Sequence, residues 1–171
     1  DPITPLRGLR ERATNAEVVY ARGCGILGDD RSGFDEAVRL ASESDVAVLV
    51  LGLSQLIEGE EGQEEGVSGG QRTLGDRTRI DLPPTQQALL EAVHATGTPV
   101  VLVILSGSAV AVNWAHEHVP AIIQAWYPGQ AGGTALAEVL FGDVNPAGRL
   151  PVTIYRSVDQ LPPFTDYAMA G

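Results

Sequence analysis

Two long aliphatic runs dominate the hydrophobic pattern of the chain. Residues 46–51 read VAVLVL and residues 100–105 read VVLVIL, and no polar residue interrupts either run. A strand covered on both faces shows such a continuous run, whereas a strand with one exposed face alternates. The two runs therefore predict central parallel strands. Shorter apolar runs predict three further strands, at residues 18–20, 121–123 and 152–155.

The segments between these runs have helical spacing. Their apolar residues recur at steps of three and four, and a proline near the start or a glycine after the end marks several boundaries. The predicted helices are one that opens at Thr4-Pro5, one at residues 34–41, one at 89–93 after Pro83-Pro84, and one at 134–140 that Gly142 ends.

Alternation of helices and strands decides the expected fold class. Such an order favours a parallel sheet with helices on its faces. We therefore expect an α/β protein, a three-layer α/β/α sandwich with a mainly parallel sheet. The length of 171 residues predicts a single domain over residues 1–171.

Composition excludes several classes of function. The chain has 22 acidic residues and 11 basic ones, for a formal net charge of −11, so the phosphates of a nucleic acid would be repelled. All the basic residues are arginines, and the absence of lysine excludes lysine-containing phosphate loops and Schiff-base enzymes. Cys24 is the only cysteine, and it forms no zinc-ligand spacing with the three histidines.

The termini and the apolar runs give two further expectations. No apolar run approaches the roughly 20 residues of a membrane span, so we expect no membrane partner. The amino terminus shows no charged-then-apolar leader, and the chain is interpreted as an excised or processed piece of a soluble protein.

Residues 52–82 interrupt the alternation and predict a long loop at the carboxyl end of a central strand, where open parallel sheets bind ligands. Five glutamates crowd into eight positions of this loop, and their repulsion should raise at least one carboxyl pKa, as a general acid requires. A solvated surface loop and a calcium site remain alternatives, although the spacing is not that of an EF-hand. The glutamates are Glu58, Glu60, Glu61, Glu64 and Glu65; Arg72, Arg77 and Arg79 follow them and could form salt bridges or contact hydroxylated ligands.

Three other segments were weighed as sites. The glycine-rich residues 127–134 precede a helix and suit either a tight turn or, less well, a phosphate. Ser106 and Ser108 follow a central strand, but the GxSxG pattern of a serine nucleophile is absent around them. Nothing in the sequence identifies His94, His116 or His118 as the base that such a nucleophile needs. Trp126 and Tyr127 lie at a strand end, where they would fill the core or stack on a sugar.

A family resemblance sharpens this picture. Residues 126–151, WYPGQAGGTALAEVLFGDVNPAGRLP, closely resemble the signature of the carboxyl-terminal α/β-sandwich domain of family 3 glycoside hydrolases. The segments LVLGLSQLIEGEEG, DRTRIDLPPTQQALLEAV and PVVLVILSGSAVAVNWA resemble earlier parts of that domain, so the resemblance covers nearly the whole chain. It is strongest to the bacterial β-glucosidase and β-xylosidase branch.

The resemblance implies a retaining exo-acting β-glycosidase whose site is shared between two domains. In that family a (β/α)8-type barrel carries an aspartate nucleophile, and a sandwich loop of the form I-x-(A/G)-E supplies the glutamic acid/base. That loop corresponds to residues 57–60, which makes Glu60 the first candidate. Glu61 is the second, because the doubled glutamate leaves the register ambiguous by one, and Glu58 is the third; Glu58 and Arg77 are candidate substrate-binding residues.

The resemblance also sets the expected partners. The substrates would be β-linked glucosides, xylosides or oligosaccharides, no metal or organic cofactor is implied, and many relatives are secreted or periplasmic. The barrel is missing from this sequence, so the chain alone should lack the nucleophile and be inactive. Two alternatives stay open: a sugar-binding domain without catalysis, and a purely structural domain fragment.

Overall fold

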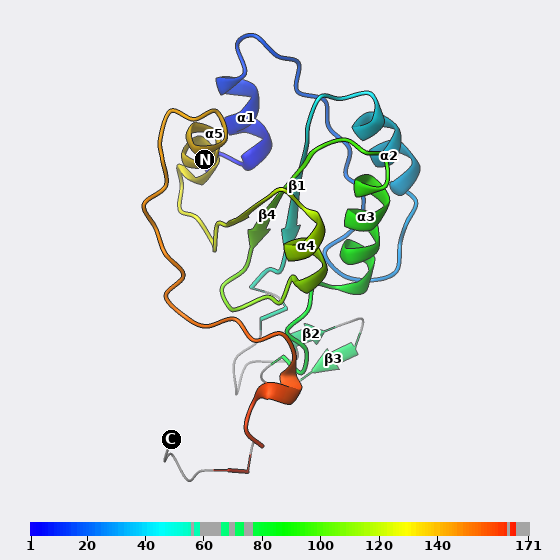
Figure 1. Cartoon of the computed structure of the whole chain (residues 1–171), viewed down its shortest axis with the longest axis vertical. Coiled ribbons are helices and arrows are strands. Elements are labelled where there is room, and N and C mark those ends of the chain that lie inside the picture. Colours follow the sequence, from blue (N-terminus) through cyan, green and yellow to red (C-terminus); the bar gives the residue numbers. More distant parts are fainter. Residues whose placement is uncertain (56, 59–65, 69–70, 74–76, 164, 167–171) are drawn as a thin grey trace.

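The computed structural model describes residues 1–55, 57–58, 66–68, 71–73, 77–163 and 165–166, and its central element is a three-stranded parallel sheet (Figure 1). The strand order is β1-β4-β5. All pairs are parallel, with Ala47 opposite Val100 and Val101 opposite Ala121. The strands are β1 (Ala47–Gly52), β4 (Val100–Leu105) and β5 (Ala121–Gln124). The prediction of a mainly parallel sheet is confirmed.

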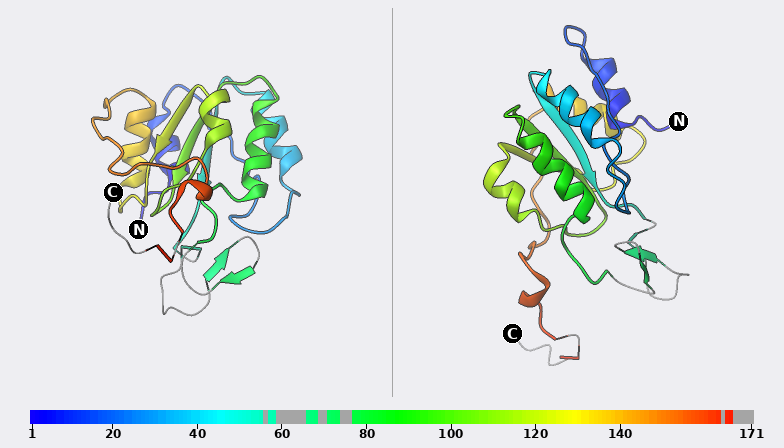
Figure 2. Two further views of the ribbon diagram at one scale, coloured as in Figure 1. Left: turned by 60° about the horizontal axis from the view of Figure 1, so that its bottom comes forward. Right: turned by 90° about the vertical axis from the view of Figure 1, so that its right-hand side faces the viewer.

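Helices cover both faces of this sheet (Figures 1 and 2). On one side lie α1 (Pro5–Arg12) and α5 (Gly132–Leu140), which pack against each other. On the other side lie α2 (Phe34–Ser42), α3 (Pro84–His94) and α4 (Asn113–His118). The α/β fold with three layers is therefore the one expected from the alternating pattern.

The core is centred on β4, whose continuous aliphatic run is covered on both faces. Leu102 and Val103 point to opposite faces of the strand, and both are fully buried. Leu90 of α3 is equally buried and belongs to the same apolar cluster as Leu102. This packing explains why β4 has no polar position.

Helices α1 and α5 meet through glycines. The hydroxyl of Thr4 accepts from the Arg7 amide at 3.2 Å and caps α1, as expected from the Thr4-Pro5 pair. A Cβ on Gly8 would lie 2.0 Å from the carbonyl oxygen of Gly133, and the Gly133 amide donates to the Ile3 carbonyl at 2.9 Å. The two backbones therefore touch where a side chain would separate them.

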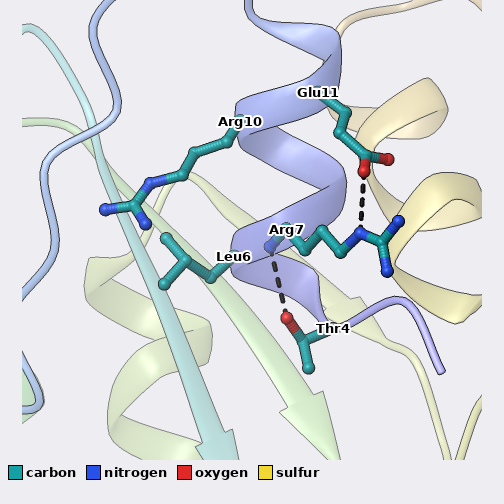
Figure 3. Close-up of a pocket in the computed structure, with 5 residues that line it drawn as sticks. All are labelled: Thr4, Leu6, Arg7, Arg10 and Glu11. Atoms are coloured by element: carbon teal, nitrogen blue, oxygen red, sulfur yellow. Dashed lines mark hydrogen bonds and ion pairs between the residues drawn. The ribbon is translucent and has the colours of Figure 1, made fainter. Parts of the chain in front are cut away.

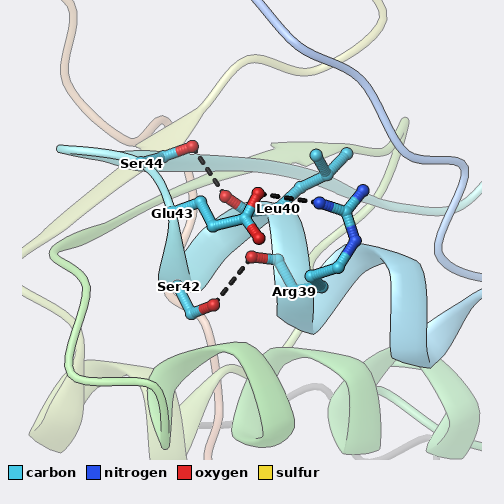
Figure 4. Close-up of polar contacts among 5 residues, drawn as sticks. All are labelled: Arg39, Leu40, Ser42, Glu43 and Ser44. Carbon is cyan, nitrogen blue, oxygen red and sulfur yellow. Dashed lines mark hydrogen bonds and ion pairs between the residues drawn. The ribbon is translucent and has the colours of Figure 1, made fainter.

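Serine hydroxyls complete the carboxyl end of α2 (Figure 4). Ser42 and Ser44 donate to the carbonyls of Arg39 and Leu40, each at 2.7 Å, and Arg39 pairs with Glu43 at 2.7 Å. These hydroxyls are second donors to the two carbonyls, which also accept from the Glu43 amide at the end of the helix. They end α2 shortly before β1 begins.

The carboxyl end of β1 is held by a buried amide side chain. Gln86 of α3 accepts from the Gly52 amide at 2.7 Å and donates to the Gly52 carbonyl at 2.8 Å. Gly52 has a φ of +134°, and a Cβ there would lie 2.0 Å from the Leu105 carbonyl oxygen. Only glycine fits where β1 gives way to the segment that follows.

Two of the predicted short strands are absent. Residues 18–20 and 152–155 belong to no strand, and Tyr20 and Val152 are more than half exposed. Each run is only three or four residues long, and β propensity alone does not hold such a run in place without a paired neighbour. These two predictions were wrong.

The predicted loop at residues 52–82 contains two short strands. β2 (Gly66–Ser68) and β3 (Gln71–Thr73) pair in antiparallel register, with Val67 opposite Arg72. The sequence holds Gly69-Gly70 between them, a hairpin signal that the loop interpretation overlooked. A short 3-10 helix, Val158–Gln160, is the last element in the part of the chain that the structure describes.

None of the helices in the part of the chain that the structure describes is both long and apolar enough to cross a membrane.

Candidate active site

Three segments that are distant in sequence converge beyond the carboxyl ends of the parallel strands. Glu58 follows β1, Gly107 and Ser108 follow β4, and Tyr127 follows β5. Hydrogen bonds join all three segments at Glu58. This is the sheet edge at which ligands bind in open α/β proteins.

The Glu58 carboxylate is the centre of the site. Its Oε1 accepts from the Ser108 amide at 2.8 Å and from the Ser108 hydroxyl, and its Oε2 accepts from the Gly107 amide at 2.7 Å and from the Tyr127 hydroxyl. A carboxylate has about four acceptor positions, so protein donors occupy all of them. A sugar hydroxyl would have to displace one of these donors.

Glycine at position 107 makes this approach possible. A Cβ there would lie 2.9 Å from the Tyr127 ring and 3.1 Å from Glu58 Oε2. The exposed backbone of Gly107 can therefore present its amide to the carboxylate while the tyrosine ring lies alongside.

Hydrogen bonding fixes the charge state of Glu58. Partial burial by itself would raise the pKa of this carboxyl, but the hydrogen bonds from Ser108, Tyr127 and the two backbone amides outweigh burial and lower the pKa from its ordinary value of 4.5. Glu58 is thus ionised near neutral pH. The five crowded glutamates predict that at least one carboxyl has a raised pKa, and Glu58 is not that one. An ionised carboxyl cannot act as a general acid.

Arg77, in the second half of the predicted loop at residues 52–82, contacts the same turn after β4. Its Nη2 donates to the Ser108 hydroxyl at 2.6 Å and to the Ala109 carbonyl at 2.7 Å. Burial lowers the pKa of Arg77, while the nearby charge of Glu58 opposes that shift. Ser108 Oγ therefore accepts from Arg77 and donates to Glu58, linking the two.

Tyr127 forms the outer side of the site. Burial raises its pKa, and the hydrogen bond and charge of Glu58 raise it further, so the phenol stays protonated and donates. The preceding Trp126 has a φ of +56°, a left-handed conformation that is costly for a residue with a large side chain. This turn directs Tyr127 back toward Glu58, and the aromatic pair lies at the strand end expected from the sequence.

Several predicted site residues lie outside the described residues. The first two candidates for the acid/base, Glu60 and Glu61, belong to this group, as do Glu64 and Glu65. The side chain of Arg72 is not described either, whereas Arg79 lies 3.8 Å from Asp81 in an exposed ion pair. The two candidate substrate-binding residues, Glu58 and Arg77, are both described, and the hydroxyl of Ser108 links them.

The partners of Glu58 were not predicted from the sequence. The pattern suggested a nucleophile at Ser108, and a turn or an aromatic surface at Tyr127, but no hydrogen bond from either residue to a glutamate. The signal available was positional, because each of these residues follows a predicted parallel strand, and such strands end at one edge of the sheet.

The contacts in the structure exclude two other candidate sites. Ser106 is fully buried, donates to the Ser108 carbonyl at 2.8 Å and accepts from Gln124, so it is no exposed nucleophile. At the start of α5 the amides of Gly132 and Gly133 donate to backbone carbonyls at 2.9 Å each. The glycine-rich segment is therefore a tight turn and not a phosphate loop.

An open pocket of about 300 Å³ beside α1 is separate from this edge (Figure 3). Arg7 and Glu11, which line it, pair with each other at 2.7 Å. The remaining lining residues are Thr4, Leu6 and Arg10, so every side chain comes from one helix or its cap. Within the described ranges no group of three or more His, Cys, Asp or Glu is arranged to hold a metal ion.

Comparison with known proteins agrees with the resemblance seen in the sequence. The model of the glycosyl hydrolase family 3 C-terminal domain matches residues 2–170. A β-xylosidase of Formosa agariphila is 38% identical over 94% of this chain and 20% of its own length. A periplasmic β-glucosidase of Salmonella typhimurium is 33% identical over 99% of this chain and 23% of its own length.

Solved structures show the same fold. A β-glucosidase from Erythrobacter marinus superposes with a TM-score of 0.76 at 34% identity, over 95% of this chain and 24% of that one. An exo-β-xylosidase of family 3 superposes with a TM-score of 0.73 at 32% identity, over 87% of this chain and 18% of that one. The chain thus spans about a fifth of the length of the proteins that it matches.

Proposed function

Because the chain belongs to the C-terminal domain family of the family 3 glycoside hydrolases, we propose that it supplies the general acid/base and part of the sugar site of a retaining, exo-acting β-glycosidase. Its substrates are β-linked glucosides, xylosides or oligosaccharides, the classes named by its β-glucosidase and β-xylosidase relatives. The rest of the site comes from a (β/α)8 barrel domain.

One observation supports this role above the others. The acidic segment begins at Glu58, which is held at the ligand-binding edge of the sheet beside Arg77 and Tyr127. Glu60, the first candidate for the acid/base, follows Glu58 by two positions in the sequence. Arg77 and Tyr127 place a guanidinium and a phenol near the position where a hydroxylated ligand would lie.

The chemistry divides between two carboxyl groups. The barrel carboxylate attacks the anomeric carbon, while the Glu60 carboxylic acid protonates the departing glycosidic oxygen. Glu60, then ionised, removes a proton from the water that releases the sugar. The two groups must lie about 5 Å apart, which a loop at the edge of a cleft between two domains can achieve.

The acid role of Glu60 has a specific kinetic test. In the chain together with its barrel domain, Glu60→Gln should lower kcat/KM for aryl β-glycosides with poor leaving groups by about 100-fold or more, since general acid catalysis contributes about 10² to 10⁴. Glycosides with good leaving groups need little protonation, so their kcat/KM, which reports only the first step, should fall much less. Glu61→Gln is the matched control; if it alone shows this dependence on the leaving group, the register shifts by one and Glu61 is the acid.

The two-domain proposal is tested with the chain alone. A panel of aryl β-glucosides and β-xylosides should show no turnover above that of Glu60→Gln prepared in parallel. Turnover that the substitution abolishes would place both carboxyl groups within these 171 residues and overturn the proposal. Full activity of Glu60→Gln and Glu61→Gln in the presence of the barrel would favour a sugar-binding or structural domain.

A further inference from the structure

Glu58 and Arg77, the two ends of segment 58–77, both contact one hydroxyl group. That hydroxyl belongs to Ser108, which lies on the turn after β4. Glu58 and Arg77 are 19 positions apart, yet the Ser108 hydroxyl donates to one and accepts from the other. A side chain belonging to neither end therefore joins them.

We propose that Ser108, with Glu58 and Arg77, forms a clasp that closes segment 58–77 on the β4 turn and positions the acid/base glutamate which the segment carries. This inference rests on the proposed function of that segment. The three residues are positioning residues: they hold the segment and do not contact the reacting atoms.

The contacts suit a fixed attachment better than a sugar-binding role. Protein donors fill the acceptor positions of Glu58, and two of them are backbone amides whose places are set by β4. The single Nη2 atom of Arg77 already donates to both the Ser108 hydroxyl and the Ala109 carbonyl. Glu58 and Arg77 are therefore both fixed to the turn after β4.

The backbone beneath the clasp is also rigid. Gly52 at the end of β1 is held through both of its backbone groups by buried Gln86, and its amino-side neighbours pair with β4 in register. The Leu53 amide donates to the Leu105 carbonyl at 2.7 Å and extends that contact past the strand. Gly52 and Leu53 are thus fixed to the carboxyl end of β4, which leads into the turn that carries Ser108.

Amide hydrogen exchange tests the clasp directly. Ser108→Ala should speed exchange of the Glu58 and Arg77 amides by about tenfold or more while β4 stays protected. Ser108→Thr, which keeps a hydroxyl, should restore slow exchange, and Ser42→Ala on α2 is the matched control at a serine with no part in the site. Unchanged exchange in Ser108→Ala would overturn the clasp.

The positioning role needs a second measurement, made on the chain with its barrel domain. A small displacement of a catalytic group lowers rate steeply, so Ser108→Ala should reduce kcat/KM for poor leaving groups by about 10- to 100-fold, with a much smaller loss of kcat/KM for good ones. An equal loss for both classes, or none, would overturn positioning.

The two readouts separate this inference from the proposed function. If Glu60→Gln and Glu61→Gln leave activity unchanged, the proposed function fails, and the exchange result still decides whether the clasp exists. If those variants behave as expected and only the Ser108→Ala leaving-group dependence is absent, the positioning role alone is wrong.

Discussion

Glu58 shows how strongly a few hydrogen bonds can set the behaviour of one residue. Its neighbours in sequence are other glutamates, whose repulsion favours a protonated carboxyl. Its neighbours in space are two backbone amides and two hydroxyl donors, which favour the ionised form. The spatial neighbours dominate, and this outcome could not be predicted from the sequence because Ser108 and Tyr127 lie 50 and 69 positions away.

Stability should therefore depend on pH through Glu58. The pKa of Glu58 is lower in the folded chain than its ordinary value of 4.5. Its contribution to stability is therefore complete above about pH 5 and is lost as the pH falls below 4.5, through the pKa of the folded chain. Glu58→Gln removes the charge and places an amide donor against other donors. The melting temperature of Glu58→Gln should be lower than that of the unchanged chain near pH 7.

The difference between the two melting temperatures should shrink as the pH falls below 4.5. Glu117→Gln, at an exposed position of α4, is the control and should show little difference at either pH. A gap between Glu58→Gln and the unchanged chain that grows on acidification would contradict the assignment of Glu58 as an ionised anchor.

At the scale of elements, the strand ends depend on glycine. Gly52→Ala should lower the free energy of unfolding by about 2 to 4 kcal/mol, because it combines a strained φ with a Cβ overlapping the Leu105 carbonyl. Gly97→Ala provides the matched comparison. Its φ of +82° is also left-handed, but nothing lies within 4 Å of the new Cβ, so the loss should be about 1 kcal/mol.

Urea unfolding of both variants would decide between these contributions. Equal losses for Gly52→Ala and Gly97→Ala would mean that the contact with Leu105 is not close in solution.

Because α1 and α5 are in contact, we expect Gly8→Ala to destabilise the folded chain, although helix propensity alone would favour alanine. Alanine is a better helix former than glycine by about 1 kcal/mol, so Gly8→Ala would stabilise an isolated α1. In the folded chain the new Cβ meets the Gly133 carbonyl, and we expect a net loss of about 2 kcal/mol in the free energy of unfolding. Gly129→Ala, whose Cβ would meet nothing within 4 Å, should change it by less than about 0.5 kcal/mol.

How well each element could be predicted follows from its length and its neighbours. The run at 100–105 matches β4 to the residue, whereas the equally long run at 46–51 begins and ends one residue before β1 does. The run at 152–155 is equally rich in β-branched and aromatic residues, but no neighbouring strand pairs with it. The pattern along a chain reports which segments can form strands, and pairing decides which of them do.

At the scale of the whole molecule, the parallel sheet brings the site together. β1, β4 and β5 all point the same way, so their carboxyl ends deliver Glu58, Ser108 and Tyr127 to one edge. The α/β class and this edge could be predicted from alternation alone. The individual contacts could not, because they depend on the conformation of the turns after the strands, such as the left-handed Trp126.

The net charge of −11 gives a prediction for the molecule as a whole. Repulsion should prevent association with a DNA duplex even at about 50 mM salt, where electrostatic attraction to phosphates is strong. Fluorescence anisotropy of a labelled duplex should stay constant as the chain is added. A rise that disappears at higher salt would reveal a basic surface that the overall charge conceals.

The meeting of Glu58 and Arg77 at Ser108 also bears on how the intervening stretch can change. When both ends of a loop are fixed, doubling the number of residues between them adds only about 0.6 kcal/mol of closure entropy. Insertions and deletions between the two attachment points should therefore change the free energy of unfolding little, while substitutions at the attachment points themselves should change it more. The length of this stretch can thus vary without rebuilding the sheet that carries it.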